Sequence, residues 1–336
     1  MLSLNFVMYM KKTFLLLTLL CGVLTAWAHD AEVDGIFYNL NKADKTATVT
    51  FKGGYYDSYK DEYAGDVVIP KAVTYDGITY SVTSLGYHCF SGCSSLTSIT
   101  IPNSVASLGV ECFFGCSSLT SITIPNSVTS LGDCCFYGCS SFTSITIPNS
   151  VTSLGDLCFR GCSSLTSITI PNSVTSLGEG CFYGCNSLTS ITIPTSVTSL
   201  GDYCFYGCYS LTSITIPNSV TSLGDFCFNS CYSLTSIYML PTTPPGTGSD
   251  VFGATLLATV YVVDENAKTA YQAQYPWNSY AIVVMATTGI EELEADKTAP
   301  TIVGYYDLNG KPINGKQRGA AILRYSDGTT RKVLVK

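Results

Sequence analysis

Charged residues are scarce in this chain. Only 12% of its 336 residues are Asp, Glu, Lys or Arg, and acidic residues outnumber basic ones by 24 to 17. A nucleic-acid-binding surface needs clustered Lys and Arg to neutralise phosphates, so this composition excludes nucleic acid as the principal partner. Hydrophobic residues make up 46% of the chain, which is enough to build a core and argues against disorder.

Long apolar runs are also missing after residue 30, despite a mean hydropathy of +0.28. No segment there approaches the roughly 20 apolar residues that a membrane-spanning helix needs. Histidine occurs only twice, at His29 and His88, and no Ser-His-Asp set, carboxylate pair, phosphate loop or metal triad is visible. We therefore expect neither an enzyme nor a cofactor or metal site.

The N-terminus has the pattern of a secretory signal. Lys11 and Lys12 precede an apolar stretch at 14–24, and Ala-Trp-Ala at 26–28 matches a small-residue cleavage site. These features predict a signal peptide over 1–28 and a mature chain that leaves the cytoplasm.

Cysteine is abundant and regularly spaced. Fourteen of the 16 cysteines form seven C-x-x-x-C pairs at a spacing of 23 residues, within a repeated S-L-G-x-x-C-F-x-G-C-x-S-L-T-S-I-T-I-P-N-S-V-T unit. The pairs begin at Cys89, Cys112, Cys135, Cys158, Cys181, Cys204 and Cys227. Such a period predicts a solenoid in which each repeat is one rung. Nearly identical rungs create a long surface rather than a point where unlike catalytic groups converge.

Each rung contains the L-x-x-L-x-L spacing of leucine-rich repeats. Ser98 and Thr100 alternate with Ile99 and Ile101, so they should point outward from a short strand that Pro102 ends. The Cys-Phe-x-Gly-Cys segment should pack inward from a tight helical turn. The predicted fold is a repeat solenoid, with a parallel β-sheet on one face and short helical turns on the other.

An open solenoid end would expose core and unpaired backbone, so we expect a cap at each end. Changes in composition predict these divisions: signal peptide 1–28, N-terminal β cap 29–83, seven leucine-rich repeats 84–244, C-terminal cap 245–287, linker 288–300 and a small C-terminal β domain 301–336. Within the C-terminal cap, 265–274 should form a short helix.

The repeated unit resembles the BspA-like leucine-rich repeat family of bacterial surface proteins, over roughly residues 60–285. The resemblance implies adhesion to host matrix proteins, to other bacterial surface proteins or to glycans. The segments 306–310, 324–328 and 332–336 resemble a type IX secretion sorting domain. That second resemblance implies export across an outer membrane, with 301–336 engaging the secretion machinery.

The paired cysteines allow several interpretations: metal binding, redox chemistry, disulfides formed after export, or small buried side chains. Zinc sites prefer C-x-x-C spacing, and cysteines four apart on one turn meet poorly for a disulfide. Free cysteine packs well as a small buried side chain, so we favour packing. Cys134 lies outside the repeat and is the best candidate for an exposed thiol.

A column of acidic residues recurs at the same period: Asp133, Asp156, Glu179, Asp202 and Asp225. It could bind cations or steer a partner, but a carboxylate directly after glycine is also typical of a helix N-cap, which we favour.

Aromatic residues form further columns. Phe114, Tyr137, Tyr183 and Tyr206 share one column, which Arg160 should interrupt. The candidate partner-binding residues are Tyr183, Tyr203, Tyr206, Tyr209, Phe226 and Tyr232. Stacked exposed aromatics indicate binding, whereas rings packed on neighbouring rungs indicate a structural role; both interpretations remain open. We expect a secreted or cell-surface adhesin, with a glycan-capture subunit or a structural scaffold without a specific ligand as alternatives.

Overall fold

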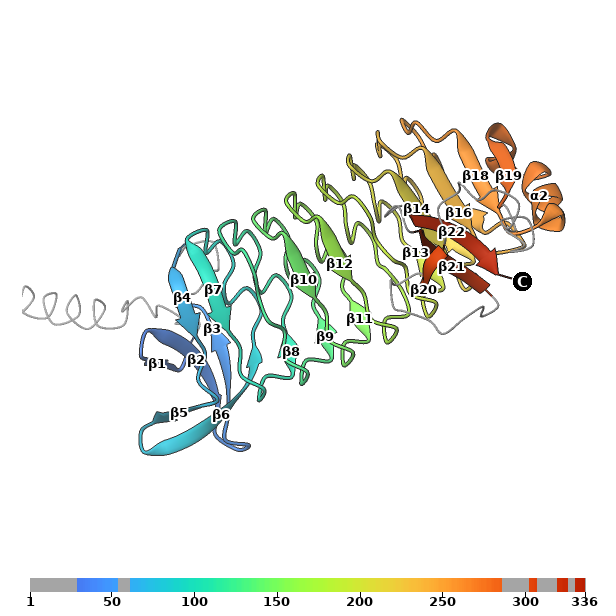
Figure 1. Ribbon diagram of the computed structural model, residues 1–336. Coiled ribbons are helices and arrows are strands. Elements are labelled where there is room, and N and C mark those ends of the chain that lie inside the picture. The colour runs from blue at the N-terminus through green and yellow to red at the C-terminus, as the bar shows by residue number, and fades with distance from the viewer. Residues whose placement is uncertain (1–28, 54–60, 286–301, 307–318, 326–329, 336) are drawn as a thin grey trace, which may run out of the picture.

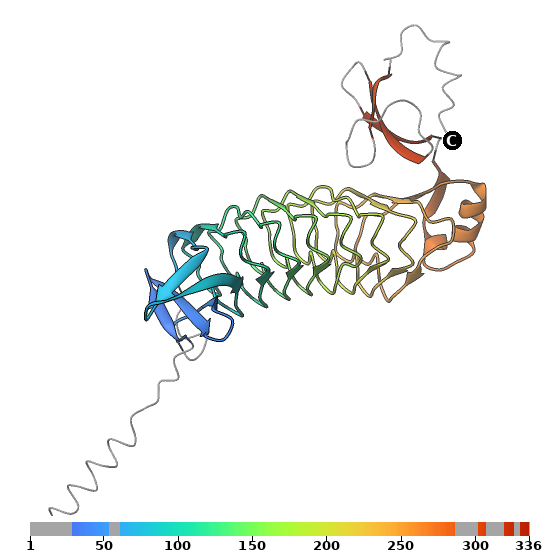
Figure 2. The ribbon, with the colours of Figure 1, turned by 90° about the horizontal axis from the view of Figure 1, so that it is seen from below.

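The computed structural model describes residues 29–53, 61–285, 302–306, 319–325 and 330–335. The predicted signal peptide over 1–28 and the predicted linker over 288–300 lie outside the described residues. The chain from the first cap to the last forms one elongated solenoid (Figure 1). Seen from below, its rungs stack side by side along a single axis, with the N-terminal cap at one end and a helix-containing cap at the other (Figure 2).

The N-terminal cap is continuous with the rungs. Strands β1 (Ala31–Val33), β2 (Ile36–Asn41) and β3 (Thr46–Thr50) pair antiparallel, while β3 pairs parallel with β6 (Ile78–Leu85). Strand β5 (Ala72–Tyr75) forms an antiparallel hairpin with β6. Because β6 then pairs with the first rung, the cap satisfies backbone groups that the end of the solenoid would otherwise expose.

Two parallel ladders run along the rungs. The first contains the short Ser-Leu strands β8 (Ser107–Leu108), β9 (Ser130–Leu131), β11 (Ser153–Leu154), β13 (Ser199–Leu200), β15 (Ser222–Leu223) and the final β17 (Gly246–Thr247). The second contains β4 (Gly65–Val68), β7 (Leu96–Thr100), β10 (Ser144–Thr146), β12 (Ser167–Thr169), β14 (Ser213–Ile216), β16 (Ser236–Met239), β18 (Thr259–Val262) and β19 (Ala281–Val284). The Ser-Leu ladder was not predicted.

Among the regular repeats, the register of both ladders equals the repeat length. Ser130 pairs with Ser153 in the first ladder, and Ser213 pairs with Ser236 in the second, each 23 residues away. The step from Ser222 to Gly246 is 24 residues, because one residue, Leu240, is added between Met239, which still pairs with Ile216, and the proline-rich segment over 241–245. Equivalent side chains therefore lie directly above one another on every face of the solenoid.

The third side consists of the predicted short turns, which do not continue into a helix. The N–H groups of Cys112 and Phe114 donate within their own rung, to Gly109 and Glu111. The intervening N–H of Phe113 donates to the carbonyl of Cys135 in the next rung, at 2.8 Å. A helix would direct all these N–H groups along its own chain. The turn N–H groups can alternate between their own rung and the next because Glu111 adopts the left-handed conformation, with φ +53°.

The core lies between the two ladders and the turns. Each full rung contributes buried leucine, isoleucine, valine, cysteine and phenylalanine side chains, as the repeat pattern predicts. The phenylalanines stack in one column with centroids 5.2–5.8 Å apart: Phe90, Phe113, Phe136, Phe159, Phe182, Phe205, Phe228 and Phe252. Burial stabilises each such side chain by roughly 1.5–3 kcal/mol, but only when neighbouring rungs cover it.

The C-terminal cap closes the column with a large aromatic side chain. Helix α2 (Glu265–Gln272) agrees with the predicted helix and begins at Asp264, whose Oδ1 accepts the N–H of Ala267 at 2.8 Å. The 3-10 helix η2 (Trp277–Ser279) places the fully buried Trp277 edge-on against Phe252, with centroids 5.4 Å apart. Among the described residues, no helix has the length and apolar character needed to cross a membrane.

The last described strands form a separate antiparallel sheet. Strand β21 (Gly319–Tyr325) pairs with both β20 (Ile302–Tyr306) and β22 (Thr330–Val335). The predicted C-terminal β domain therefore consists of three strands in its described part.

The glycine of each Ser-Leu-Gly segment is required by close approach between rungs. A Cβ built on Gly155 would lie 2.4 Å from the backbone nitrogen of Asp133 and 2.5 Å from the carbonyl carbon of Gly132. We expect Gly155→Ala to lower the free energy of unfolding by about 1–3 kcal/mol, because the rungs must separate locally. Chemical denaturation followed by circular dichroism measures the change.

Gly246→Ala is the matched control. The nearest atom to a Cβ at that position is the Thr221 carbonyl oxygen at 3.8 Å, an ordinary contact. The same denaturation midpoint for both variants would contradict the explanation by close approach.

Candidate binding surface

The acidic column forms hydrogen bonds between rungs. Oδ1 of Asp133 accepts the backbone N–H of Asp156 at 2.9 Å, and Oδ1 of Asp156 accepts that of Glu179 at the same distance. Oδ1 of Asp202 accepts the N–H of Asp225 at 2.7 Å. The carboxylate thus caps the backbone of the following rung, whereas we predicted an N-cap within its own turn. The difference arises because the turn N–H groups alternate between rungs.

The repeat cysteines are buried thiols, and the packing interpretation is confirmed. All fifteen described cysteines are free, and those of the seven pairs are at most 1% exposed. The second cysteine of a pair donates its S–H to the phenylalanine carbonyl of the preceding rung. Cys162 Sγ lies 3.2 Å from the carbonyl oxygen of Phe136. The same bond, at 3.0–3.2 Å, is made by Cys116, Cys139, Cys185, Cys208 and Cys231.

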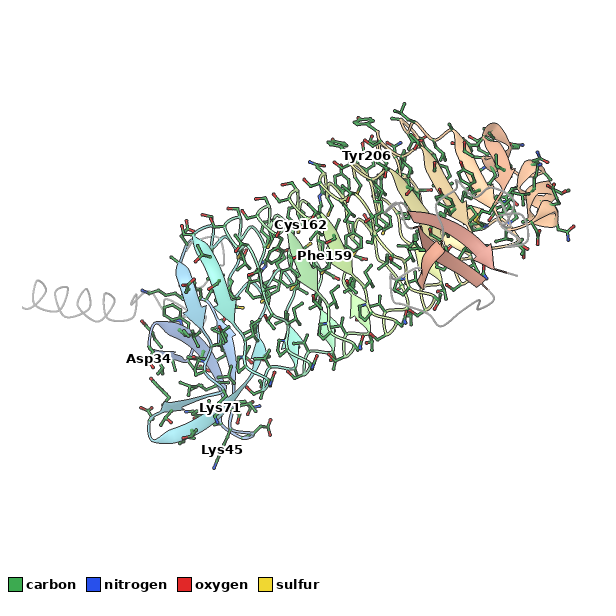
Figure 3. The ribbon with its side chains drawn as sticks, viewed as in Figure 1. Asp34, Lys45, Lys71, Phe159, Cys162 and Tyr206 are labelled. Carbon is green, nitrogen blue, oxygen red and sulfur yellow. The ribbon has the colours of Figure 1, made fainter. Side chains whose placement is uncertain are left out.

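This burial also sets the chemistry of the thiols. Cys162 and Phe159 lie inside the solenoid (Figure 3). Burial raises the pKa of Cys185 to about 12, so its reactive thiolate form is scarce at neutral pH. Among the described residues, no three His, Cys, Asp or Glu side chains converge closely enough to hold a metal ion.

Cys134 differs from the other described cysteines because it is only half-buried. Partial burial, followed by the nearby Glu111 carboxylate, raises its pKa to about 11. We expect one slowly reacting thiol in the native mature chain, with a labelling rate that increases as pH rises toward 11. Mass spectrometry after timed labelling with a thiol reagent measures this, and Cys134→Ser should abolish the native signal.

Denatured protein prepared without reductant provides the control for that labelling. It should expose every cysteine of the mature chain as a free thiol. A shortfall would mean that disulfides form after export, and several fast native thiols would contradict the buried columns.

The first aromatic column is continuous over five rungs. Phe114 and Tyr137 stack with centroids 4.6 Å apart, and Tyr183 and Tyr206 stack at 4.7 Å. Arg160 joins the two pairs: its Cζ lies 5.3 Å from the Tyr137 ring centroid and 4.2 Å from that of Tyr183. The prediction that Arg160 interrupts the column is therefore wrong. A planar guanidinium stacks on aromatic faces and takes the place of a ring.

The last repeats add two more aromatic columns. Tyr203 and Phe226 stack at 5.1 Å, and Tyr203 also lies 5.9 Å from Tyr206. Tyr209 and Tyr232 stack at 5.1 Å, and their side chains are 45% and 51% exposed. Of the six candidate residues, Tyr183, Tyr203, Tyr206 and Phe226 form one half-buried cluster, while Tyr209 and Tyr232 form an exposed pair. Tyr206 lies at the outer edge of the solenoid (Figure 3).

These contacts show how both interpretations of the aromatics can hold together. Each ring packs one face against a neighbouring ring, which stabilises the stacking of rungs. The rest of the ring surface is partly open, most at Tyr209 and Tyr232.

Charge is distributed unevenly along the molecule. Charged side chains such as Asp34, Lys45 and Lys71 gather on the N-terminal cap (Figure 3). Between residues 84 and 244 the sequence contains no lysine, and Arg160 is its only arginine. The acidic residues of that stretch all belong to the turns, whereas its strands contain no charged residue. The turn side is therefore an acidic and aromatic surface. The side formed by the ladder that contains β14, which we call the strand side, is lined by uncharged hydroxyl groups.

Two aromatic residues on the strand side were missed. Tyr238 in β16 and Tyr261 in β18 occupy the row of Thr215, and their rings stack at 4.8 Å. The period itself places them in that row, but the irregular last rungs obscured it. A groove of about 450 Å³ also lies near this end, lined by Asn218 and Thr221 on one side and 241–245 on the other.

Arg160 allows a direct test of the continuous column. Arg160→Ala removes two stacking contacts and should lower the free energy of unfolding by about 1 kcal/mol. Arg160→Tyr places a ring between two rings and should be at least as stable as the native chain. Thermal denaturation of both variants measures the difference, and equal destabilisation by tyrosine and alanine would show that Arg160 does not act as a ring in the column.

Comparison with known proteins agrees with this geometry. The model of the BspA type leucine-rich repeat region matches residues 72–166 and 152–275, which together cover more than half of the chain. No curated protein matched the chain. Nine chains of solved structures match.

A leucine-rich repeat protein from Bacteroides ovatus ATCC 8483 is 28% identical, with a TM-score of 0.52 over 76% of this chain and 77% of that chain. A leucine-rich repeat protein from T. pallidum is 24% identical, with a TM-score of 0.48 over 74% and 97% of the two chains. A leucine-rich cell surface protein from Faecalibacterium prausnitzii A2-165 is 22% identical, with a TM-score of 0.47 over 81% and 98%. The first of these supports the leucine-rich repeat fold.

Proposed function

Since this chain belongs to the BspA type leucine-rich repeat family, we propose that it is a secreted or cell-surface binding protein. It contacts protein or glycan partners through the turn side of its repeats and acts as an adhesin. The partner is a host matrix protein, a bacterial surface protein or a glycan, and binding involves no catalytic step.

The observation that carries this proposal is the exposed Tyr209–Tyr232 pair, together with the Tyr203–Tyr206–Phe226 cluster on the turns of the same rungs. Tyrosine provides a large contact area and a polar tip with few rotatable bonds, and it is enriched among residues that dominate binding energies. Stacking holds these rings in place before a partner arrives, so little side-chain entropy is lost on binding.

We also propose that the protein is exported to the outer cell surface. The signal-like sequence at 1–28 supports export, and the sorting-domain resemblance over 301–336 supports passage through the secretion machinery to the outer surface. Strands β20, β21 and β22 are compatible with a small domain that such machinery engages.

A glycan-capture role is the second candidate, and the strand side favours it. Rows of serine and threonine lead to the stacked Tyr238 and Tyr261 there, and this part of the surface is uncharged. Neutral sugars form hydrogen bonds with hydroxyl groups of a protein and stack on its aromatic rings. A structural scaffold without a ligand is the remaining alternative.

Binding of purified mature protein to an array of matrix proteins and glycans tests these roles. We expect saturable binding that the double variant Tyr206→Ala/Tyr209→Ala reduces at least about tenfold, because two anchors are removed. The matched control is Tyr238→Ala/Tyr261→Ala, which removes a stacked pair from the other side and should leave that binding intact.

Three other results would contradict binding through the turn side. Loss of binding only in the Tyr238→Ala/Tyr261→Ala variant would favour glycan capture on the strand side. Equal loss in both variants would indicate a shared folding defect, which circular dichroism detects and single tyrosine variants resolve. No binding by folded protein to any spot would favour the scaffold.

A further inference from the structure

The acidic column and the aromatic columns lie next to each other on the last repeats. Asp202 directly precedes Tyr203, and Asp225 directly precedes Phe226. Both carboxylates are at least partly exposed, and Oδ1 of each accepts a backbone N–H from the next rung, which fixes the side chain in place. A partner that covers the tyrosines must therefore also meet two oriented carboxylates.

Charge decides which partner fits. A neutral polymer can donate hydrogen bonds to these carboxylates, but it removes water without compensating their charge, and this opposes binding. A cationic partner replaces the water with charge-assisted hydrogen bonds. Because the repeats contain a single arginine and no lysine, the surface does not neutralise these acids with several cations of its own.

The molecule already contains one example of the group that such a surface accepts. The guanidinium of Arg160 lies between Tyr137 and Tyr183, in the column that continues to Tyr206. The acidic column follows the same rungs, with Asp156 four residues before Arg160. One guanidinium therefore already packs between stacked tyrosine rings on this side of the solenoid.

We propose that the acid–tyrosine strip binds an arginine-bearing segment of a partner protein. The strip consists of Asp202, Tyr203, Tyr206, Tyr209, Asp225 and Tyr232. Guanidinium groups stack on the tyrosine rings, while their N–H groups donate to the aspartate carboxylates. Arginine suits this strip better than lysine, because only its planar group both stacks and donates two parallel hydrogen bonds. The inference rests on the proposed function and names the partner's chemistry.

Titration of the full chain with synthetic peptides tests the proposal. The probes are a flexible Gly-Ser peptide carrying spaced arginines and the same peptide with lysine or with citrulline, the uncharged isostere of arginine. Calorimetry should show saturable binding of the arginine peptide, at least about tenfold weaker binding of the lysine peptide, and no binding of the citrulline peptide. Affinity should fall as salt is raised, because exposed charges are screened.

Two test variants and one matched control locate the binding. Asp202→Asn/Asp225→Asn removes both charges but retains the Oδ1 acceptor for the next rung, and it should weaken arginine-peptide binding about tenfold. The matched control Asp133→Asn/Asp156→Asn makes the same change in the same column, away from the exposed tyrosines, and should leave the affinity unchanged. Tyr209→Ala/Tyr232→Ala should weaken binding without changing the thermal midpoint by more than a few degrees.

The proposal is overturned if citrulline and arginine peptides bind alike, or if the control and test asparagine variants lose affinity equally. Failure of the arginine peptide while array partners still bind through Tyr206 and Tyr209, independently of salt, would also overturn it. That result would leave the proposed binding function in place and would point to a neutral glycan.

Discussion

No rung can satisfy all of its backbone groups without its neighbours, and the rest of the structure depends on this constraint. The strand segments and alternate turn N–H groups donate to residues one period away. Glycines allow the rungs to approach closely enough, because a Cβ at Gly155 would lie only 2.4 Å from the backbone nitrogen of Asp133. Close and uniform stacking then places every side chain above its equivalent, so that Phe113 meets Phe136 and Asp133 meets Asp156. Columns of like residues are a consequence of backbone pairing.

Much of this arrangement could be predicted from the sequence, because a repeat of 23 residues determines which side chains share a column. The buried cysteines, the outward Ser98 and Thr100, and the helix beginning at Glu265 follow from period and polarity. The Ser-Leu ladder could not be predicted from hydrophobicity, since two residues such as Ser107 and Leu108 are too short for a strand pattern. Left-handed conformations at non-glycine positions such as Glu111 and Tyr203 also leave no clear sequence signal.

The candidate binding surface, too, could be predicted only in part. Its residues were identified from columns of aromatics, but their exposure depends on geometry that the sequence does not specify. Tyr203 turns toward the Tyr183–Tyr206 column, whereas Tyr209 and Tyr232 remain open. Arg160 was misjudged because a cation in an aromatic series suggests a break, while stacked planar groups at this spacing accept a guanidinium. Tyr238 and Tyr261 were missed because their rungs depart from the repeat.

The constant register has one more consequence. Since the contacts between the regular rungs recur with a period of 23 residues, removing or inserting a whole rung recreates the same contacts at the junction. The two caps would not sense the change, because each touches only its nearest rungs. The solenoid could therefore lengthen or shorten by whole units of 23 residues without affecting its caps. Because the tyrosine-rich rungs adjoin the C-terminal cap, such changes would move them nearer to or farther from the N-terminal end while preserving their geometry. In a surface protein, the number of uniform rungs would set reach, and the irregular last rungs would set selectivity.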